Sequence, residues 1–205
     1  MRAVLLLLLT LLSGCSLFRQ STGLIPRSTT AFGEVITQAD KDRLRDWRSS
    51  FAEGLDAARA SGHAAEIARE GALLDPDAAL TDPAIPNGAY RCRVIKLGAR
   101  PPATNTFVSS PAFSCAINGQ GNLQRLAKLN GIQRYVGLIF PGDALREVFL
   151  GTLILGDESR ALQYGQDEPR DVAGYVERIG TNRWRLLMPD PQFESRYDVM
   201  ELVPA

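Results

Sequence analysis

From Gly88 onwards, apolar and polar residues alternate in short segments, and tight-turn sequences separate these segments. A period of two is the pattern of a β-strand with one buried face, whereas a helix needs a period near 3.6. Asn-Gly pairs favour hairpins in particular. The turn sequences are Asn118-Gly119, Asn130-Gly131, Pro141-Gly142-Asp143 and Gly180-Thr181-Asn182. This part of the chain is therefore strongly constrained to an antiparallel β domain.

The alternation predicts about eight strands joined mostly by short turns. Such a succession is typical of an up-and-down meander that closes, or nearly closes, into a small barrel. The predicted fold class is α+β, mostly β, with the β domain over residues 88–205. The predicted strands are Tyr90–Leu97, Ala112–Asn118, Leu123–Leu129, Gln133–Phe140, Arg146–Leu155, Val172–Ile179, Arg183–Met188 and Asp198–Val203.

The segment before the β domain has the period of a helix. Thr37 followed by Asp40 resembles a capping box, and Gly62 is a typical helix stop. A second helix is predicted over His63–Leu74, ended by Asp75-Pro76. Apolar residues of the first helix recur at spacings of three and four, which gives one stripe: Leu44, Trp47, Phe51, Leu55 and Ala58. We expect a helical hairpin over residues 37–75 that packs on the barrel, so that residues 37–205 fold as one unit.

One predicted strand is apolar on both faces, over Val148–Leu155. A strand of this kind needs cover on its outer side. We expect the stripe of Trp47, Phe51 and Leu55 to provide that cover. The alternative is an exposed apolar patch that binds a partner or lipid.

The first residues have the features of a bacterial lipoprotein signal. Arg2 is followed by an apolar segment, Ala3–Leu12, which is too short to span the ~30 Å core of a bilayer. Ser13 and Gly14 then precede Cys15, whose thiol can carry a diacylglyceryl group. We expect residues 1–14 to be a lipoprotein signal peptide and residues 15–36 to be a flexible tether lipidated at Cys15. A plain secretory signal cut nearby is the alternative.

This signal predicts a protein of the bacterial cell envelope that is anchored to the lipid bilayer and faces the periplasm. Ser16 favours the outer membrane, by analogy with lipoproteins in which Asp at that position favours inner-membrane retention. The remaining cysteines, Cys92 and Cys115, lie on the apolar faces of neighbouring predicted strands. In a secreted protein such a pair indicates a disulfide. Two separate buried thiols are the alternative.

The charge balance argues against nucleic acid as a partner. The chain has 23 basic and 23 acidic residues, and loss of Arg2 leaves 22 against 23, a net charge of −1. No basic patch is present. His63 is the single histidine, so neither a zinc site of cysteines and histidines nor a Ser-His-Asp triad is expected. We predict no cofactor and no metal.

The longest hydrophilic connection between strands runs over residues 156–171. Long polar loops often carry function, and paired carboxylates can act as acid and base. A hydrogen-bonded structural loop is the expected role, and catalysis is the alternative. The candidate polar residues are Asp157, Glu158, Tyr164, Asp167, Arg170 and Asp171.

A small barrel can also hold an apolar ligand. Tyr90 on the first strand, and Trp184 between Arg183 and Arg185 on a late one, are loosely similar to the aromatic and arginine that close lipocalin-type barrels. The early Trp of that pattern is absent. The simpler interpretation is that these aromatic side chains fill the core.

Several segments after residue 64 are distinctive in sequence. They are Ala65–Ala68 through Leu73–Pro76, Tyr90–Gly98, Phe149–Thr152, Tyr164-Gly165 through Asp171–Gly174, and Trp184–Leu186 to Phe193-Glu194. In these segments the chain resembles an uncharacterised bacterial family of about this length, the domain of unknown function 4893. The resemblance implies no activity and no catalytic residues.

The sequence therefore predicts a non-enzymatic envelope lipoprotein, a binding or scaffolding module with an envelope protein as partner. One alternative is a lipocalin-like carrier of a small apolar ligand or lipid, which requires a cavity. Another is a periplasmic protease inhibitor that makes contact through its tether. An enzyme would require the polar loop residues to converge on one pocket.

Overall fold

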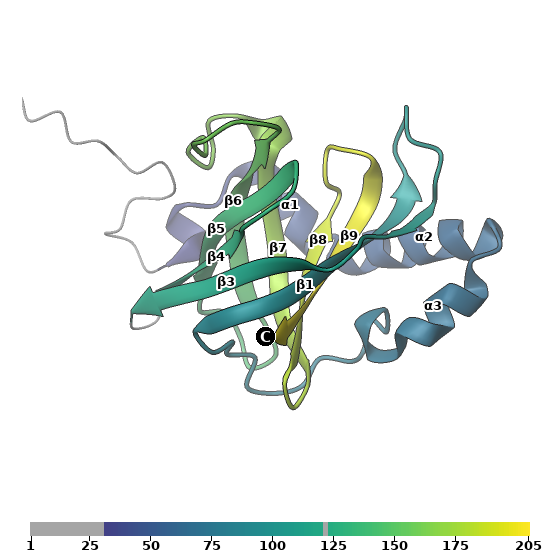
Figure 1. Cartoon of the computed structure of the whole chain (residues 1–205), viewed down its shortest axis with the longest axis horizontal. Helices are drawn as coiled ribbons and strands as arrows, with labels where there is room; N and C mark the ends of the chain where they lie inside the picture. The colour runs from purple at the N-terminus through teal and green to yellow at the C-terminus, as the bar shows by residue number, and fades with distance from the viewer. Residues whose placement is uncertain (1–30, 121–122) are drawn as a thin grey trace, which may run out of the picture.

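The computed structural model describes residues 31–120 and 123–205, shown in Figure 1. The predicted signal peptide and the lipidation site at Cys15 lie outside these residues. The helices precede the sheet in the chain, apart from a short 3-10 helix, η3, at Glu168–Arg170. They are η1 (Phe32–Glu34, 3-10), α1 (Gln38–Arg45), α2 (Trp47–Ala60), α3 (Ala64–Glu70) and η2 (Gly71–Leu73, 3-10).

Eight antiparallel strands close into a barrel, and one extra strand pairs outside the ring. Each strand pairs with the next along the barrel, and β1 pairs with β9 to close it, while β2 pairs with β1 alone. The strands are β1 (Gly88–Ala99), β2 (Phe107–Ser109), β3 (Phe113–Gln120), β4 (Leu123–Lys128), β5 (Gln133–Phe140), β6 (Glu147–Leu155), β7 (Asp171–Gly180), β8 (Arg183–Pro189) and β9 (Ser195–Pro204). The predicted fold class and barrel are confirmed.

Two details of the predicted sheet are wrong. Strand β2 was not expected, because three residues are too few to display alternation. The turn predicted at Asn118-Gly119 is part of β3, where Gly119 lies opposite Gln124. A Cβ at Gly119 would lie 2.5 Å from the carbonyl oxygen of Leu123, so glycine at this position allows the two strands to approach each other closely.

Large apolar side chains fill the interior of the barrel. The buried cluster inside it includes Cys115, Ile117, Phe149, Trp184 and Leu202. Room for Phe149 comes from a cross-strand glycine pair, Gly137 and Gly151. A Cβ on either glycine would lie 2.6 Å from the end of the Phe149 ring. At this point in the interior, the Phe149 ring packs directly against the backbone of the two glycines.

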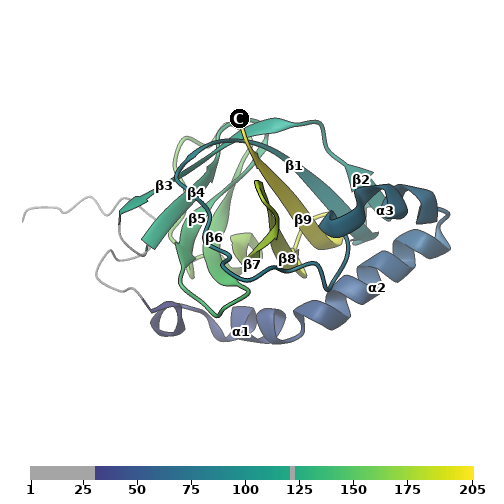
Figure 2. The ribbon, with the colours of Figure 1, turned by 90° about the horizontal axis from the view of Figure 1, so that it is seen from below.

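The helices form two covering segments rather than one hairpin with a continuous first helix. Thr37 caps α1 as predicted, because its side chain accepts a hydrogen bond from the backbone N–H of Asp40. The helix then ends at Asp46, which has φ −94° and ψ 9°, and α2 starts in a new direction. Figure 2 shows α1 and α2 outside the ring of strands, with α3 folded back beside α2.

The break at Asp46 lets the two helices cover different parts of a curved wall. Leu44 of α1 packs with Val148 and Leu150 of β6. Phe51 and Leu55 of α2 pack instead on β1, β7, β8 and β9. One straight helix could not follow both surfaces.

The outer face of β6 is covered, as the sequence predicts, but by different residues. The cover comes from Leu44 and Ile36, with Tyr164 from the long loop, and not from the stripe of Trp47, Phe51 and Leu55. The exposed-patch alternative is therefore wrong. Phe32 and Val35 also pack against this cluster, so the folded domain starts before residue 36, where the tether was predicted to end.

A buried ion pair joins the helices to the barrel. Glu177 of β7 and Arg185 of β8 are both fully buried, with Nη2 of Arg185 2.6 Å from Glu177 Oε2. Arg185 Nη1 also donates hydrogen bonds to the backbone carbonyls of Ala72, Leu73 and Asp75. These carbonyls lie at the end of η2, where a helix leaves acceptors free. Arg185 therefore holds the end of the helical segment against the sheet.

Candidate functional site: the polar mouth of the barrel

The two ends of the barrel differ in their connections. Long connections, including residues 100–106 and 156–170, meet at the end where β1, β4, β6 and β8 finish. We call this end the mouth; it is the upper end in Figure 1. Shorter connections, among them 141–146 and 181–182, lie at the other end.

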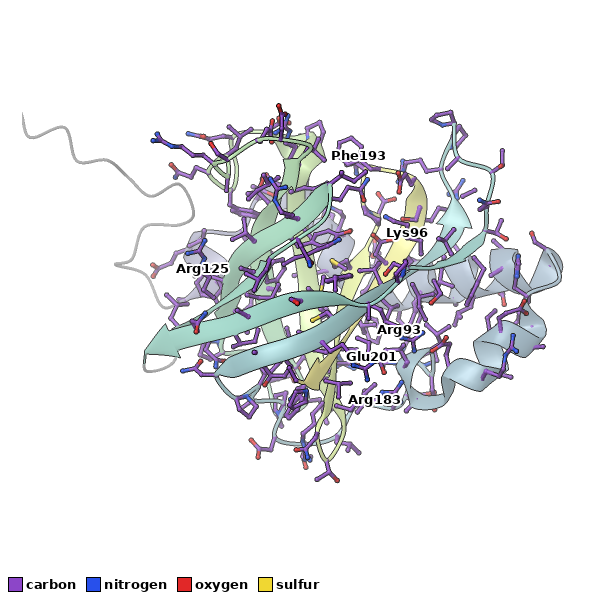
Figure 3. The ribbon with its side chains drawn as sticks, in the orientation of Figure 1. Arg93, Lys96, Arg125, Arg183, Phe193 and Glu201 are labelled. Atoms are coloured by element: carbon purple, nitrogen blue, oxygen red, sulfur yellow. The ribbon has the colours of Figure 1, made fainter. Side chains whose placement is uncertain are left out.

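Strand alternation brings polar side chains to the inside of the mouth. On β1, Tyr90, Cys92 and Val94 belong to the interior cluster, so Lys96 continues the same inward face. By the same alternation, Asp198 follows Met200 and Leu202 of β9. Figure 3 shows Lys96 and Phe193 toward this end, with Arg93, Glu201 and Arg183 farther from it.

Asp198 is the centre of the mouth. Its carboxylate is fully buried, and Oδ2 accepts hydrogen bonds from Lys96 Nζ at 3.1 Å and Tyr135 OH at 3.0 Å. The Ser195 hydroxyl donates to the other oxygen. Burial and the charge of Asp198 raise the pKa of Tyr135 well above its usual value, so Tyr135 stays a neutral donor.

Lys96 has a second carboxylate nearby. Its Nζ lies 3.4 Å from Glu194 Oε2, and Glu194 Oε1 accepts a hydrogen bond from Gln133 at 3.3 Å. Glu194 is in the loop between β8 and β9, so this contact ties that loop to the mouth.

Lys128 extends the polar group across the barrel from β4. Its Nζ lies 4.1 Å from the ring centroid of Phe113 and 6.0 Å from that of Tyr135. Both are cation–π distances. Burial lowers the pKa of Lys128, and the charge of Lys96 lowers it further. Among the residues that the structure describes, none forms an ion pair or hydrogen bond with Lys128.

A small cavity opens beside Lys96, Tyr135 and Asp198. Its volume is about 20 Å³, roughly enough for one water molecule, whereas sites for drug-sized ligands measure about 300–1,000 Å³. Its lining includes Lys96, Tyr135, Arg170, Asp171, Phe193 and Asp198. The mouth can therefore receive a water or one small polar group without rearrangement.

The aromatic residues of the lipocalin comparison are part of the packed core. Tyr90 and Trp184 meet edge to face with ring centroids 6.3 Å apart. The Tyr90 hydroxyl donates to the carbonyl of Pro86, and the Trp184 indole to that of Pro83. Packing of this kind argues against a carrier with a hollow barrel.

The six residues predicted in the polar loop do not converge on one pocket. Glu158 pairs with Arg170 at 2.8 Å, and Arg170 with Asp167 at 3.2 Å. Two hydrogen bonds lower the pKa of Glu158: the larger effect comes from the backbone N–H of Leu155 and the smaller one from Arg170. Asp157 is exposed. These contacts are typical of a structural loop. Arg170, which forms two of them, also lines the mouth cavity.

Tyr164 and Asp171 belong to a second set that faces the helices. The Tyr164 hydroxyl donates a hydrogen bond to the buried Asp40, which also pairs with Arg43 at 2.5 Å. Both oxygens of Asp171 accept from the backbone N–H of Gly165, at 3.0 and 3.1 Å. Burial raises the pKa of Asp171 to about 6. This set fixes the long loop and α1 to the wall of the barrel.

Cys92 and Cys115 are both buried in the barrel interior and are free thiols in the structure. Their side chains form a hydrogen bond with each other, which together with burial raises the pKa of Cys92 far above its usual value. The predicted placement on neighbouring strands is confirmed, and the predicted disulfide is not shown.

His63 lies at the start of α3, where its ring stacks on Phe107 at 5.4 Å and its Nδ1 is 3.6 Å from Glu66. Within residues 31–120 and 123–205, no group of three or more His, Cys, Asp or Glu side chains could hold a metal ion. No helix in these ranges is long and apolar enough to cross a membrane.

The sequence contains a signal for the mouth that the polar-loop argument missed. On four strands the inward-facing positions are apolar except for the one nearest the mouth, which is polar. These polar residues are Lys96 (after Val94), Lys128 (after Leu126), Tyr135 (on the same face as Gly137 and Ile139) and Asp198 (before Met200). A polar residue at the end of an inward face marks the rim of a barrel. Which rim residues meet could not be predicted without the strand order.

A family model described as "Domain of unknown function (DUF4893)" matches residues 33–202. No curated protein and no solved structure was found to match the chain.

Proposed function

We propose that this chain, which belongs to the family Domain of unknown function (DUF4893), is a lipid-anchored, non-enzymatic envelope protein that binds a partner at the polar mouth of its barrel. The lipid anchor is argued from the sequence, through Leu12-Ser13-Gly14-Cys15 after an apolar segment. We place the protein in the bacterial envelope, facing the periplasm, on the outer membrane.

The observation that carries the binding role is the contrast between a packed barrel and a polar, buried mouth. Removing charged groups from water is costly even when they form an ion pair, so the pair of Lys96 and Asp198, together with the half-buried Lys128, is an unfavourable feature for a barrel with a purely structural role. The long connections also gather at this end, and such loops are common places for recognition.

A non-enzymatic role is supported by how the candidate acids and bases are used. Asp198 is held by Lys96, Tyr135 and Ser195. Of the loop carboxylates, Glu158 pairs with Arg170 and Asp171 accepts from a backbone N–H group. These partners compete with proton transfer to a substrate.

We also propose that Cys92 and Cys115 form a disulfide in the oxidising periplasm. The bond would join β1 to β3 within the barrel and close a loop of roughly two dozen residues, worth about 3 kcal/mol in the chain-entropy model.

Native mass spectrometry of the full-length protein, extracted in mild detergent from its own envelope, tests this proposal. We expect a mass that starts at an acylated Cys15, a further loss of two hydrogens for the disulfide, and a bound protein partner. An unmodified full-length mass would overturn the location. An abundant small apolar adduct would favour the carrier, and a protease bound through residues 15–36 would favour the inhibitor.

A further inference from the structure

The mouth cavity has walls of two different origins. One wall belongs to the barrel strands and includes Lys96, Tyr135 and Asp198. The other includes Arg43 of α1 and Arg170 at the end of the long loop, both of which lie outside the ring of strands. A movement of this outer wall would therefore change the size of the cavity.

The helix α1 and the loop over residues 156–170 are joined to each other and to the barrel. The hydroxyl of Tyr164 in the loop donates a hydrogen bond to Asp40 of α1. Arg43 of α1 donates to the backbone carbonyl of Asp171, at the start of β7, at 3.1 Å. We call α1 together with residues 156–170 the lid, because both parts contribute to the outer wall of the cavity.

Apolar burial holds α1 less firmly than α2. The buried residues of α1 are Leu44 and the charged Asp40, whereas α2 buries Phe51, Leu55 and further small residues on the barrel. Segments with few buried apolar contacts open at a lower free energy than the core. The break at Asp46 separates the two helices, so α1 can move while α2 stays in place.

The joint beneath the lid contains poorly compensated negative charge. Asp40 and Asp171 are both buried, and Arg43 pairs with Asp40 at 2.5 Å and also faces Asp171. Asp167 of the loop, which pairs with Arg170, is a further negative neighbour of Asp171. Asp171 therefore shares the charge of Arg43 with Asp40, and ionised Asp171 favours a state in which water reaches it.

We propose that the lid opens as one unit, with its hinge at Asp46, and so widens the mouth for a group larger than a water molecule. The lid stays closed while Asp171 holds a proton and opens more readily when Asp171 is ionised. The closed cavity of about 20 Å³ has room for roughly one water, so entry of anything larger requires the opening. This inference rests on the proposed function, because it concerns access to the proposed binding end.

The pH dependence of the lid has a definite sign. Burial raises the pKa of Asp171 from 3.8 to about 6, and contact with water in the open state would return the pKa towards its ordinary value. The closed state binds the proton more tightly, so a rise in pH favours opening. With these two pKa values, the equilibrium constant for opening increases about tenfold between pH 5 and pH 7.5.

Hydrogen exchange of the full-length protein in mild detergent, followed by mass spectrometry, measures the opening. We expect the amides of residues 38–45 and 156–170 to share one opening constant after correction for intrinsic exchange. This constant should be at least tenfold larger than that of β6 and β7, which lie beneath the lid, and should rise about tenfold from pH 5 to pH 7.5. Asp171→Asn should remove the rise.

A tyrosine pair provides a variant and its control. Tyr164→Phe deletes the hydrogen bond to Asp40 and should raise the opening constant of both lid segments about tenfold, as expected for a hydrogen bond to a charged group. Tyr175→Phe, at a ring that lies against Trp47 of α2, should leave it unchanged. Unchanged exchange of β6 and β7 shows that the barrel of each variant is folded.

Acetylation of lysine tests whether the opening reaches the mouth. Lys96 lines the cavity with 17% of its side chain exposed, and Lys41 is exposed on α1. At fixed pH, Tyr164→Phe should raise the acetylation rate of Lys96 relative to Lys41 severalfold.

Three results would overturn the lid. One is exchange of α1 and the loop only together with β6 and β7. Another is an effect of Tyr164→Phe on the loop alone, because the two parts would then move separately. The third is an unchanged ratio of Lys96 to Lys41 acetylation.

This outcome is separable from that of the proposed function. If a partner protein co-purifies but α1 and the loop do not open together, the lid is wrong and the binding role stands. If the lid opens as described but the extracted protein is neither lipidated nor bound to a partner, the proposed function fails and the lid stands.

Discussion

At the scale of single residues, Asp198 is the side chain on which the mouth depends. It is fully buried and holds Lys96, Tyr135 and Ser195 through its two oxygens. Its removal leaves a mostly buried ammonium group and a buried hydroxyl without their main acceptor. The cost of such a loss is set by the groups left unpaired rather than by the strength of each bond.

We predict that Asp198→Ala lowers the free energy of unfolding by about 3–5 kcal/mol, as found when one partner of a buried ion pair is removed. Asp198→Asn keeps an acceptor and should cost less. Urea unfolding followed by circular dichroism measures both. A loss below about 1 kcal/mol for Asp198→Ala would show that the mouth network does not hold the barrel end together.

Asp171 gives the protein a pH dependence of definite sign. Its pKa is raised by burial from 3.8 to about 6 in the folded state. The folded chain therefore binds this proton more tightly than the unfolded chain. The stability from this group is complete below about pH 4 and is lost as the pH rises through about 6.

We predict that Asp171→Asn removes this fall in stability between about pH 4 and pH 7. Denaturant unfolding at several pH values measures it, and Asp157→Asn, at an exposed position of the same loop, is the matched control. If wild type and Asp171→Asn change in parallel with pH, Asp171 does not titrate as described.

At the scale of secondary-structure elements, the link between helices and barrel depends on one buried arginine. Arg185 reaches from β8 to Glu177 and to three carbonyls at the end of η2. Its location also explains why the sequence pattern did not reveal it. A charged residue on the outward face of a strand predicts exposure, and the covering helix becomes visible only once the elements are packed.

We expect Arg185→Met to lower the free energy of unfolding by about 3–5 kcal/mol, because it leaves Glu177 buried with Arg146 as its one remaining ion-pair partner among the described residues. The control is Arg48→Met, which breaks an exposed ion pair with Asp77 and should cost less than about 1 kcal/mol. Equal effects of the two substitutions would contradict the role of Arg185 in holding the helical segment against the barrel.

The local sequence pattern predicted some of these elements and missed others. Strand period and turn chemistry predicted the eight barrel strands, and Gln133–Phe140 matches β5 at both ends. The break at Asp46 was missed because it arises from packing against the curved barrel rather than from local preference, and β2 was missed because three residues are too few to display alternation. The cover of β6 was assigned to the wrong part of the helical stripe for the same reason.

At the scale of the whole molecule, the packed parts that stabilise the barrel are separate from the polar end for which we propose a binding role. The packed interior and the covering helices stabilise the barrel, while the long connections and the buried charges meet at one end. The sequence predicted the barrel but placed the candidate site in the polar loop. Lys96, Lys128, Tyr135 and Asp198 come from four strands, and their meeting depends on strand order and inward orientation together.

The mouth is the end of the barrel at which we propose that a partner binds. Photo-crosslinking in living cells can test this, with the crosslinking amino acid placed either at Ile132, an exposed turn position at the mouth, or at Asn182, an exposed turn position at the other end. We predict a discrete crosslinked product from position 132 that Lys128→Met reduces, and none from position 182. Equal products from both ends, or a product from position 182 alone, would contradict the account.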